Sequence, residues 1–589
     1  MGSFTGKQII FSDDYSVTWT RRRRGAQSVH ASRPGDDSEG AAPAREVLRL
    51  VLTQLLLSLR WEPTHLGLGP SSASSGDLVA IDASQRPLLS FLIRYATMTQ
   101  DLTLLSEIYW SLWCLSEDTL DPERLTYDKA RWVLIKSLEG SIEFWDGGRG
   151  TRLDQLYPDT GQIVTFRKEA LRLLAQQAAL WQQTLSLADL GIQTAGGTSE
   201  KTRVVRNRLV ELNKATEETF RQEYLSEDAY MEQVLQADPG LRDATSATSL
   251  VTARSKAFLS APVDPSVPFV GVDISNCEIL PSNAAPLLLS CWKEQPDQEQ
   301  DLEANLGNVL RRQTSEMEVT KYMVKVGDDL RQDQLVLQML HLMDLVWQER
   351  LPPAETRMLR FVPYRVLAMT PNAGYIKFVP GAVSLSKALA HSNGDLMVWL
   401  TTNRPFDKSI DEVLANLCGS AAAYCVATYV LGIGDRHLDN LQITPEGHFF
   451  HIDFGFIFGE DPKPFAPRLR LPQQIASVLM AASDPESGGS LLDKCFLLAG
   501  RAYIALRRSM PLWVSLLRVT GQAGGAGCAR LRADANAAVV VVTDRLRSDL
   551  GSHGEEEVAS EFLMVLTEST EALYPVLTDK VHQLGLFWK

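Results

Sequence analysis

Hydrophobic and polar positions along the chain follow two different periods, and the change from one to the other falls near residue 260. Before this point apolar residues recur every three to four positions, which predicts helices with one buried face. Strand-like alternation is nearly absent there, so we expect an all-helical, solenoid-like domain of stacked helical hairpins. Its clearest predicted helices are residues 48–57, 87–96, 103–115, 131–144 and 164–182.

After residue 260 short β-type runs replace the helical pattern. A proline-rich, turn-forming segment at 261–268 marks the boundary. Helices return in quantity after residue 383, so a β-rich small lobe is expected to precede a helical large lobe. The predicted strands are residues 269–272, 287–292, 321–326, 364–369 and 375–379.

Composition excludes several classes of protein. The 589 residues are 45% apolar, as in globular proteins, and carry a net charge of −14. A nucleic-acid-binding protein should carry a basic footprint, so we expect no nucleic-acid partner. The seven cysteines are scattered without metal-ligand spacing, which indicates reduced thiols. No run of 18 apolar residues and no signal-peptide core is present, so we expect a cytoplasmic protein.

The candidate chemistry is concentrated in two motifs, Gly-Asp-Arg-His-Leu-Asp-Asn and His-Ile-Asp-Phe-Gly. The first motif leads into a predicted β-hairpin, and the second lies at its end. The hairpin would bring Asn440 and Asp453 together, where both could hold a metal ion against nucleotide phosphates. Asp435, Arg436 and His437 form the predicted catalytic loop. Arg436 is expected to brace this loop rather than contact substrate.

The order Asp-Arg-His differs from the His-Arg-Asp of ordinary protein kinases. With the spacing above, it resembles the superfamily of phosphatidylinositol 3-kinases and 4-kinases. In this family the histidine is a proposed base. His437 could accept a hydroxyl proton near neutral pH, since imidazole has a reference pKa of about 6.5. The alternative is a buried structural histidine.

Lys325 ends an apolar strand pattern and precedes Val-Gly-Asp-Asp-Leu-Arg-Gln-Asp. A lysine on the inner face of a small-lobe strand can reach nucleotide phosphates, although a surface strand lysine is the plainer alternative. The family carries the same motif, Lys-x-Gly-Asp-Asp-Leu-Arg-Gln-Asp. The resemblance therefore implies that Lys325 is the phosphate lysine and that Asp333 and Tyr364 line the inner nucleotide pocket.

Further nucleotide contacts are implied by the resemblance alone. The segment Ile-Leu-Pro-Ser-Asn-Ala-Ala-Pro-Leu is similar in position to the family's phosphate-covering loop. A hinge should follow the last small-lobe strand, where backbone groups would pair with adenine and nearby apolar side chains would form the walls. The residues implied are Ser282 and Asn283 in the loop, Lys377, Phe378 and Val379 in the hinge, and Ile452 in the wall.

The segment after Asp453 resembles that of class III phosphatidylinositol 3-kinases through Gly-x-Asp-Pro-Lys-Pro and a later basic–Leu pair. Its cations, Lys463, Arg468 and Arg470, are fewer than in class I enzymes. Fewer cations suit an unphosphorylated phosphatidylinositol headgroup. The C-terminal segment is similar to the family's terminal helix and could contact membrane or dock on the large lobe. Its expected membrane residues are Leu584, Phe587 and Trp588.

The expected fold is multidomain α plus α/β, with an all-helical accessory domain before a bilobal kinase domain. The first residues do not resemble the lipid-binding β-sandwich (C2) domain that normally precedes the accessory domain in this family. The predicted parts are an atypical or disordered segment (1–44), the accessory domain (45–190), a helical linker (191–260) and the catalytic domain (261–589), with its N-lobe at about 261–380 and its C-lobe at about 381–589.

The resemblance implies ATP- and Mg²⁺- (or Mn²⁺-) dependent transfer of phosphate to the 3-hydroxyl of phosphatidylinositol. It also implies a pseudokinase-like regulatory subunit, an autophagy or endosomal scaffold, and peripheral location on endosomal, vacuolar or autophagic membranes. The missing C2 domain puts the two protein partners in question. The alternatives are a serine/threonine kinase of the same superfamily, a phosphatidylinositol 4-kinase and a catalytically silent scaffold.

Overall fold

The structure of the chain is a computed structural model. Asn283, Leu584, Phe587 and Trp588 lie outside the residues that it describes, as does nearly all of the acidic segment 295–319 that separates two of the predicted strands. The described residues are 3–4, 7–11, 17–21, 48–49, 51–62, 79–82, 87–146, 151–152, 161–223, 259–282, 284–293, 318–463, 466–546 and 554–571.

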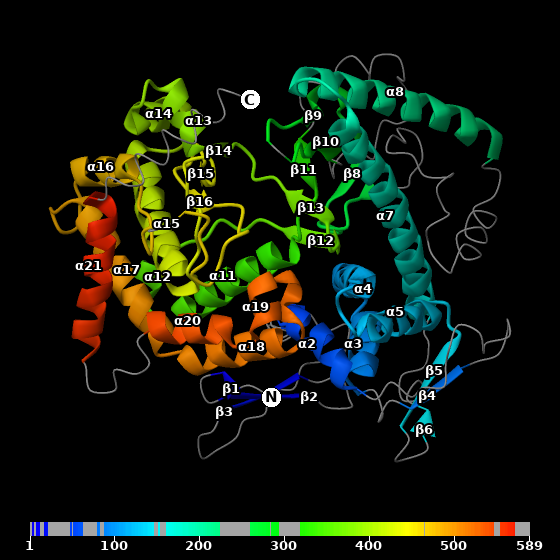
Figure 1. The fold of residues 1–589 in the computed structure, drawn as a ribbon. Helices are drawn as coiled ribbons and strands as arrows, with labels where there is room; N and C mark the ends of the chain where they lie inside the picture. The colour runs from blue at the N-terminus through cyan, green and yellow to red at the C-terminus, as the bar shows by residue number, and fades with distance from the viewer. Residues whose placement is uncertain are drawn as a thin grey trace.

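The accessory part consists of helices packed around a shared apolar core (Figure 1). Helix α4 shows why these residues fold so: Leu104, Leu105 and Ile108 follow a helical period and are fully buried. Asp101 caps this helix, because its carboxylate accepts the Leu104 N–H at 2.9 Å. The helices are α2 (Leu52–Ser58), η1 (Leu59–Trp61), α3 (Pro87–Met98), α4 (Leu102–Glu117), α5 (Arg124–Leu138) and α7 (Gly161–Gln193).

Two small sheets accompany these helices and were not expected from the sequence. One lies in the first 44 residues, and the other pairs β4 with β5 in parallel across the intervening helices. Strands of two to five residues are too short to show a period of their own. They are β1 (Ser3–Phe4), β2 (Lys7–Phe11), β3 (Val17–Arg21), β4 (Val79–Asp82), β5 (Ile142–Asp146) and β6 (Thr151–Arg152).

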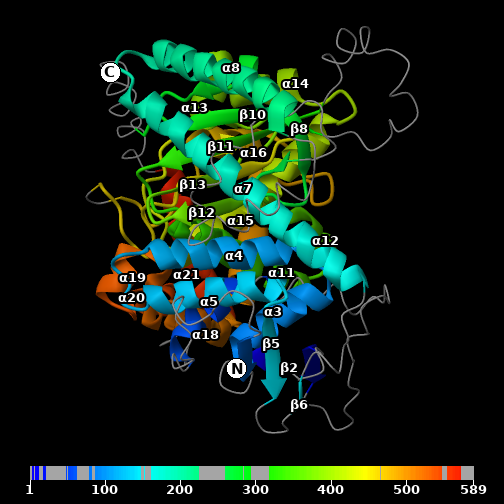
Figure 2. The ribbon, with the colours of Figure 1, turned by 90° about the vertical axis from the view of Figure 1, so that its right-hand side faces the viewer.

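Helix α7 crosses the small-lobe sheet diagonally, and α8 (Thr198–Glu223) turns back beyond it (Figure 2). Trp181 of α7 packs edge-on against Tyr375 with ring centroids 5.3 Å apart. The hydroxyls of Thr184 and Tyr375 are hydrogen-bonded at 2.5 Å. The accessory helices and the small-lobe sheet therefore share one continuous core.

The small lobe contains an antiparallel sheet in the order β12-β13-β11-β10-β8-β7, with β9 paired to β10. Helix α11 lies between this sheet and the large lobe (Figure 1). The elements are β7 (Leu259–Ser260), β8 (Pro268–Val272), η2 (Ile274–Asn276), β9 (Glu278–Ile279), β10 (Leu287–Lys293), β11 (Val319–Val326), α11 (Arg331–Arg350), α12 (Pro353–Met358), β12 (Val366–Thr370) and β13 (Ala373–Lys377).

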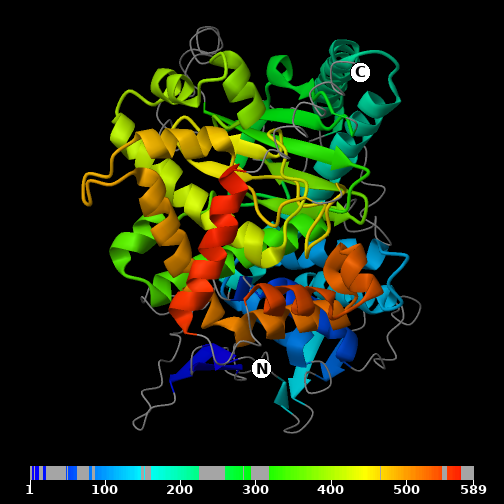
Figure 3. The same ribbon diagram turned by 60° about the vertical axis from the view of Figure 1, so that its left-hand side comes forward.

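The large lobe is helical and forms around α15, with α21 along its outer side (Figure 3). Ser409 and Glu412 form a capping box at the start of α15, and Gly432 ends it in the left-handed conformation. The elements are β14 (Val383–Ser384), α13 (Leu385–His391), α14 (Leu396–Asn403), α15 (Ile410–Leu431), β15 (Leu441–Ile443), β16 (Phe449–His451), α16 (Gln473–Ala481), α17 (Leu491–Arg507), α18 (Met510–Gln522), η4 (Gly525–Gly527), α19 (Ala529–Ala533), α20 (Ala537–Arg545) and α21 (Glu555–Glu571).

Within the described residues one helix, α15, is long and apolar enough to cross a membrane. It is 89% buried inside the large lobe over its most apolar window. Its hydrophobicity is thus accounted for by packing in the core, as for the central helix of a globular domain. The helical accessory part followed by a β-rich and a helical lobe confirms the predicted fold class.

Candidate active site

The hairpin of β15 and β16 places the two predicted metal ligands side by side. Leu441 pairs with His451 in its register, so Asn440 and Ile452 are the next residues on the two strands. The Ile452 N–H donates to the Asn440 carbonyl at 3.0 Å, and Asp453 follows directly. Asn440 is buried, and its Nδ2 donates to the Asp435 carbonyl at 3.0 Å, which leaves the amide oxygen as its ligand atom.

Two acidic residues of the site have backbone angles that most residues avoid. Asp435 has φ +52° and Asp453 has φ +59°, both in the left-handed region. Such conformations cost free energy and persist only where neighbouring contacts hold them. The sequence showed no sign of this strain.

Arg436 supplies contacts of this kind from inside the protein. Its Nε donates to the Gly434 carbonyl at 2.6 Å, its Nη1 donates to the Ile452 carbonyl at 2.8 Å, and its Nη2 donates to the Asp453 carbonyl. Burial lowers the pKa of Arg436, although the negative charge of Asp453 acts in the other direction. The side chain thus joins the catalytic loop to the metal-side segment from within the protein.

His437 lies beside Asp435, with Nε2 3.8 Å from the Asp435 Oδ2. Its Nδ1 accepts the Asp439 N–H at 3.3 Å, and Nε2 faces the Asp435 carboxylate. Lys463 Nζ lies 3.2 Å from the Asp435 Oδ1. The Asp435 N–H donates to Asp461 at 2.7 Å. The loop therefore presents a carboxylate, an imidazole and an ammonium group together.

Lys325 reaches from β11 to the metal-side segment. Its Nζ lies 2.6 Å from the Asp328 Oδ2 and 3.4 Å from the Asp453 Oδ2. Burial opposes the charge of the lysine, but Asp453 and Asp328 raise its pKa overall. Burial likewise opposes the Asp453 charge, but Lys325 and Arg436 hold the Asp453 pKa below its ordinary value. Both groups are therefore ionised at neutral pH.

Asp333 and Tyr364 contact the backbone on either side of Asp453. The Asp333 Oδ1 accepts the Phe454 N–H at 3.2 Å, and the Tyr364 hydroxyl donates to the His451 carbonyl at 3.4 Å. Burial and the charge of Asp453 raise the pKa of Asp333 to about 7. Their expected place at the inner nucleotide pocket stays a prediction.

Gln332 was missed by sequence reasoning. Its Nε2 donates to the Phe454 carbonyl at 2.7 Å, so Gln332 and Asp333 bind the two backbone groups of one residue. The available signal was its place between two motif residues, Arg331 and Asp333. The spacing of apolar residues along the predicted helix did not show whether Gln332 faces the site or the solvent.

The predicted hinge needs a correction. The Lys377 N–H donates to the Arg365 carbonyl at 2.8 Å, and the Phe378 N–H donates to the Lys321 carbonyl at 2.9 Å. These two donors complete the sheet and are not available to adenine. The Lys377 Nζ lies 2.5 Å from the buried Asp264 carboxylate, so its side chain serves the small lobe. Val379 is the next hinge residue and is half-buried.

The predicted phosphate-covering turn is held at its two ends. Ser282 is exposed, its carbonyl accepts the Ala285 N–H at 3.0 Å, and the Leu280 N–H donates to the Pro286 carbonyl at 2.9 Å. Asn283 lies outside the described residues. The strand leading into the turn is bonded to the accessory helix α8, a contact that the sequence did not predict.

Two residues of α8 make that contact. The Thr202 hydroxyl accepts the Ile279 N–H at 3.0 Å, and the Arg206 Nε donates to the Cys277 carbonyl at 2.7 Å. Gly191 of α7 leaves room for the Ile279 side chain, which lies where a Cβ would be. The helical pair α7–α8 thus supports β9 directly before the turn.

The three predicted headgroup cations separate into two groups. Lys463 lies at the catalytic loop beside Asp435, and Arg468 is exposed. Arg470 is buried instead, and its Nη1 donates to the Arg436 carbonyl at 2.6 Å. Its predicted headgroup role is therefore wrong: it supports the catalytic loop from inside. The predicted membrane residues at the C-terminus lie outside the described residues.

A divalent cation suits the donors that the site offers. Among the described residues no group of three or more His, Cys, Asp or Glu side chains is placed to hold a metal. Mg²⁺, however, is usually held by one or two protein oxygens together with substrate phosphates and water. The ionised Asp453 carboxylate and the Asn440 amide oxygen would supply such a set.

Residues 319–520 match the family model described as phosphatidylinositol 3- and 4-kinase. These residues are similar to a kinase domain of this family. The resemblance seen in the motifs is confirmed for these residues, and kinases of this family generally use ATP and a divalent metal.

Curated relatives agree with this assignment. The chain is 37% identical to the phosphatidylinositol 3-kinase VPS34 of Saccharomyces cerevisiae over 271 residues, 45% of this chain and 29% of that protein. It is 34% identical to the phosphatidylinositol 3-kinase pik3 of Schizosaccharomyces pombe over 341 residues, 56% of this chain and 38% of that protein. It is also 34% identical over 274 residues, 46% of this chain, to the root isoform of phosphatidylinositol 3-kinase of Glycine max, of which 31% is covered. The chain thus spans about a third of the length of these relatives.

Proposed function

We propose that the chain transfers the γ-phosphate of ATP to the 3-hydroxyl of phosphatidylinositol. The observation that carries the proposal is the convergence of Lys325, Asn440 and Asp453 beside the loop of Asp435 and His437. These are the parts that phosphoryl transfer requires: cationic and metal-holding groups at the phosphates, and a proton acceptor at the attacking hydroxyl. The relatives named phosphatidylinositol 3-kinase support the choice of reaction.

Each residue has a role in this proposal. Asn440 and Asp453 hold Mg²⁺, which when bound neutralises charge on the phosphates. Lys325 contacts the phosphates as a point charge. The pair of Asp435 and His437 orients the lipid hydroxyl and takes up its proton. The ionised state of Asp453 supports its role as ligand, since a metal requires a deprotonated carboxylate.

Substrate choice follows from the charge near the catalytic loop. Because Arg470 is buried, two of the three predicted headgroup cations remain, Lys463 and Arg468. The acidic residues Glu460 and Asp461 are close to Lys463 in the sequence. A headgroup without extra phosphates needs few cations. We therefore propose unmodified phosphatidylinositol rather than its phosphorylated derivatives as the substrate.

The setting of the reaction is also part of the proposal. A kinase of a membrane lipid must reach its substrate from the water side, so we propose peripheral action of a cytoplasmic protein on endosomal, vacuolar or autophagic membranes. A pseudokinase-like regulatory subunit and a scaffold remain the proposed protein partners, on the strength of the family resemblance.

The test is a substrate panel. The purified chain is incubated with ATP and Mg²⁺ on vesicles that contain phosphatidylinositol, phosphatidylinositol 4-phosphate or phosphatidylinositol 4,5-bisphosphate, and with a basic protein in solution. We expect product from the first vesicle and little from the others. Preferred phosphorylation of the bisphosphate or of the protein would overturn the proposed substrate.

A further inference from the structure

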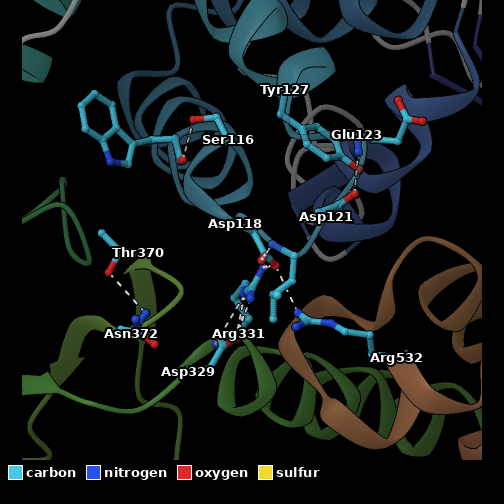
Figure 4. A network of polar contacts seen from close by, with 12 residues as sticks. Ser116, Asp118, Asp121, Glu123, Tyr127, Asp329, Arg331, Thr370, Asn372 and Arg532 are labelled. Atoms are coloured by element: carbon cyan, nitrogen blue, oxygen red, sulfur yellow. Dashed lines mark hydrogen bonds and ion pairs between the residues drawn. The ribbon is translucent and has the colours of Figure 1, made fainter.

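A buried carboxylate joins the accessory helices to both lobes of the kinase. Asp118 follows the last residue of α4, and its Oδ2 accepts hydrogen bonds from Arg331 Nη1 at 2.7 Å and Arg532 Nη2 at 3.1 Å (Figure 4). Arg331 begins α11, and Arg532 belongs to α19 of the large lobe. The Asp118 and Arg331 side chains are 4% and 9% exposed, so their ion pair is shielded from water.

The guanidinium of Arg331 is fixed on its other side as well. Its Nε and Nη2 contact the Asp329 carboxylate at 2.9 and 2.6 Å (Figure 4). Gly527 of η4 packs against the same carboxylate so closely that a Cβ there would lie 2.6 Å from Asp329 Oδ1. The position of Arg331 is therefore set by all three parts of the chain.

The two residues after Arg331 contact the metal-side segment. The Gln332 Nε2 donates to the Phe454 carbonyl, and the Asp333 carboxylate accepts the Phe454 N–H. Phe454 follows the proposed metal ligand Asp453. Three consecutive residues of one helical turn thus connect the accessory helix α4 to the position of that ligand.

This connection depends on the charge of Asp118. Burial opposes that charge, but the hydrogen bond and charge of Arg331 lower the pKa of Asp118 overall, so the carboxylate is ionised at neutral pH. Without the Asp118 charge, Arg331 would keep its pair with Asp329 but would no longer be held from α4. A cavity of about 40 Å³ beside the pair, lined by Cys114, Arg331 and Ala526 among others, gives the guanidinium room to shift.

We propose that Asp118 is a positioning residue for phosphoryl transfer: through Arg331 and the first turn of α11 it sets the place of Phe454 and of the adjoining metal ligand Asp453. The proposal rests on the kinase function proposed above. It implies that a ligand or partner which moves the end of α4 would change the metal site without touching it.

A matched pair of variants tests this role. Asp118→Asn removes the charge on Arg331. Asp121→Asn removes a comparably buried charge, which lies 2.7 Å from Arg60 in an ion pair between two residues of the accessory domain. For Asp118→Asn alone we expect faster hydrogen exchange over residues 453–458. We also expect the Mg²⁺ concentration that gives half-maximal turnover to rise about tenfold. This effect is smaller than the ~10²-fold loss of rate expected when a catalytic group itself is displaced. Full-length protein is used for both readouts.

The outcomes separate the two proposals. Wild-type turnover absent on every lipid would contradict the proposed function, and hydrogen exchange would then decide the positioning role by itself. Unchanged exchange over 453–458 in Asp118→Asn, or equal changes in both variants, would overturn the positioning role. If Asp118→Asn does not fold, Arg532→Gln removes only the more exposed second donor, and the same shifts are expected at smaller size.

Discussion

Lys325 Nζ lies 3.4 Å from the Asp453 Oδ2, so a strand of the small lobe and the metal-side segment of the large lobe meet through one ion pair. Each group stabilises the charge of the other. In the proposed function ATP binds where these two charges lie, with a phosphate contacting the lysine and a metal contacting the carboxylate. In this proposal the ion pair keeps the lysine and the carboxylate in place before ATP and metal bind.

Loss of the lysine should weaken nucleotide binding. For Lys325→Met we expect an affinity for ATP that is about 10²-fold lower, a loss of roughly 2–3 kcal/mol, because a charge-assisted contact in a shielded site is removed. The measurement is titration with a fluorescent ATP analogue. Lys321→Met, four residues earlier on the same strand, is the control and should bind as the wild type does. Equal binding by both variants would contradict the role of Lys325.

Asp333 should make stability depend on pH. Its pKa is raised from an ordinary 3.8 to about 7 by burial and by Asp453, so between these values the folded state binds a proton that the unfolded state releases. Its stabilising contribution is therefore complete below about pH 4 and is lost as pH rises to about 7. Asp333→Asn keeps the acceptor for the Phe454 N–H but removes this dependence.

Relative to the wild type, we expect Asp333→Asn to gain on the order of 2 kcal/mol in free energy of unfolding between pH 5 and pH 8. Urea denaturation at the two pH values measures the difference. An advantage that stays constant with pH would show that the Asp333 carboxyl does not titrate in this range.

The contact between α8 and β9 should affect ATP use. Thr202→Val removes the acceptor of the Ile279 N–H just before the phosphate-covering turn. We expect a KM for ATP raised about fivefold, in line with about 1 kcal/mol for one hydrogen bond, and a smaller change in kcat. Arg203→Gln, an exposed neighbour on the same helix, should leave both constants unchanged. A lower kcat with unchanged KM would count against a role at the phosphates.

Arg468 and Arg470 offer a direct comparison of two arginines two residues apart. Arg470→Met should lower the free energy of unfolding by about 2 kcal/mol, because the Arg436 carbonyl loses its buried charged donor. Arg468→Met should leave stability unchanged, since the side chain is exposed, and should weaken binding to vesicles that contain phosphatidylinositol. Thermal unfolding and vesicle sedimentation separate the two effects; identical behaviour would argue against the assignment.

Motif spacing predicted the residues that meet around one hairpin, because β-pairing converts a short separation along the chain into proximity. Asn440 and Asp453 are such a pair. The resemblance to the kinase family supplied the distant partners Lys325, Asp333 and Tyr364. No periodicity in the sequence would have joined Lys325 to Asp453 across 128 residues.

What the sequence did not predict depends on three-dimensional packing. Arg468 and Arg470 both belong to one basic segment, and only the fold shows that one of them points inward to Arg436. The N–H groups of Lys377 and Phe378 were expected to be available, but sheet registry uses them. Asp118 carries no motif at all, since its importance comes from meeting Arg331 and Arg532 in space.

The most direct measurement is identification of the lipid product made by the wild type and by Asp453→Asn. Vesicles of phosphatidylinositol are incubated with labelled ATP and Mg²⁺, and chromatography of the deacylated product gives the position of the new phosphate. We expect phosphatidylinositol 3-phosphate from the wild type and an at least ~10³-fold lower rate from Asp453→Asn, with Asp407→Asn, an exposed large-lobe aspartate, as active as the wild type. Product at another hydroxyl, or undiminished turnover by Asp453→Asn, would contradict the proposed site and reaction.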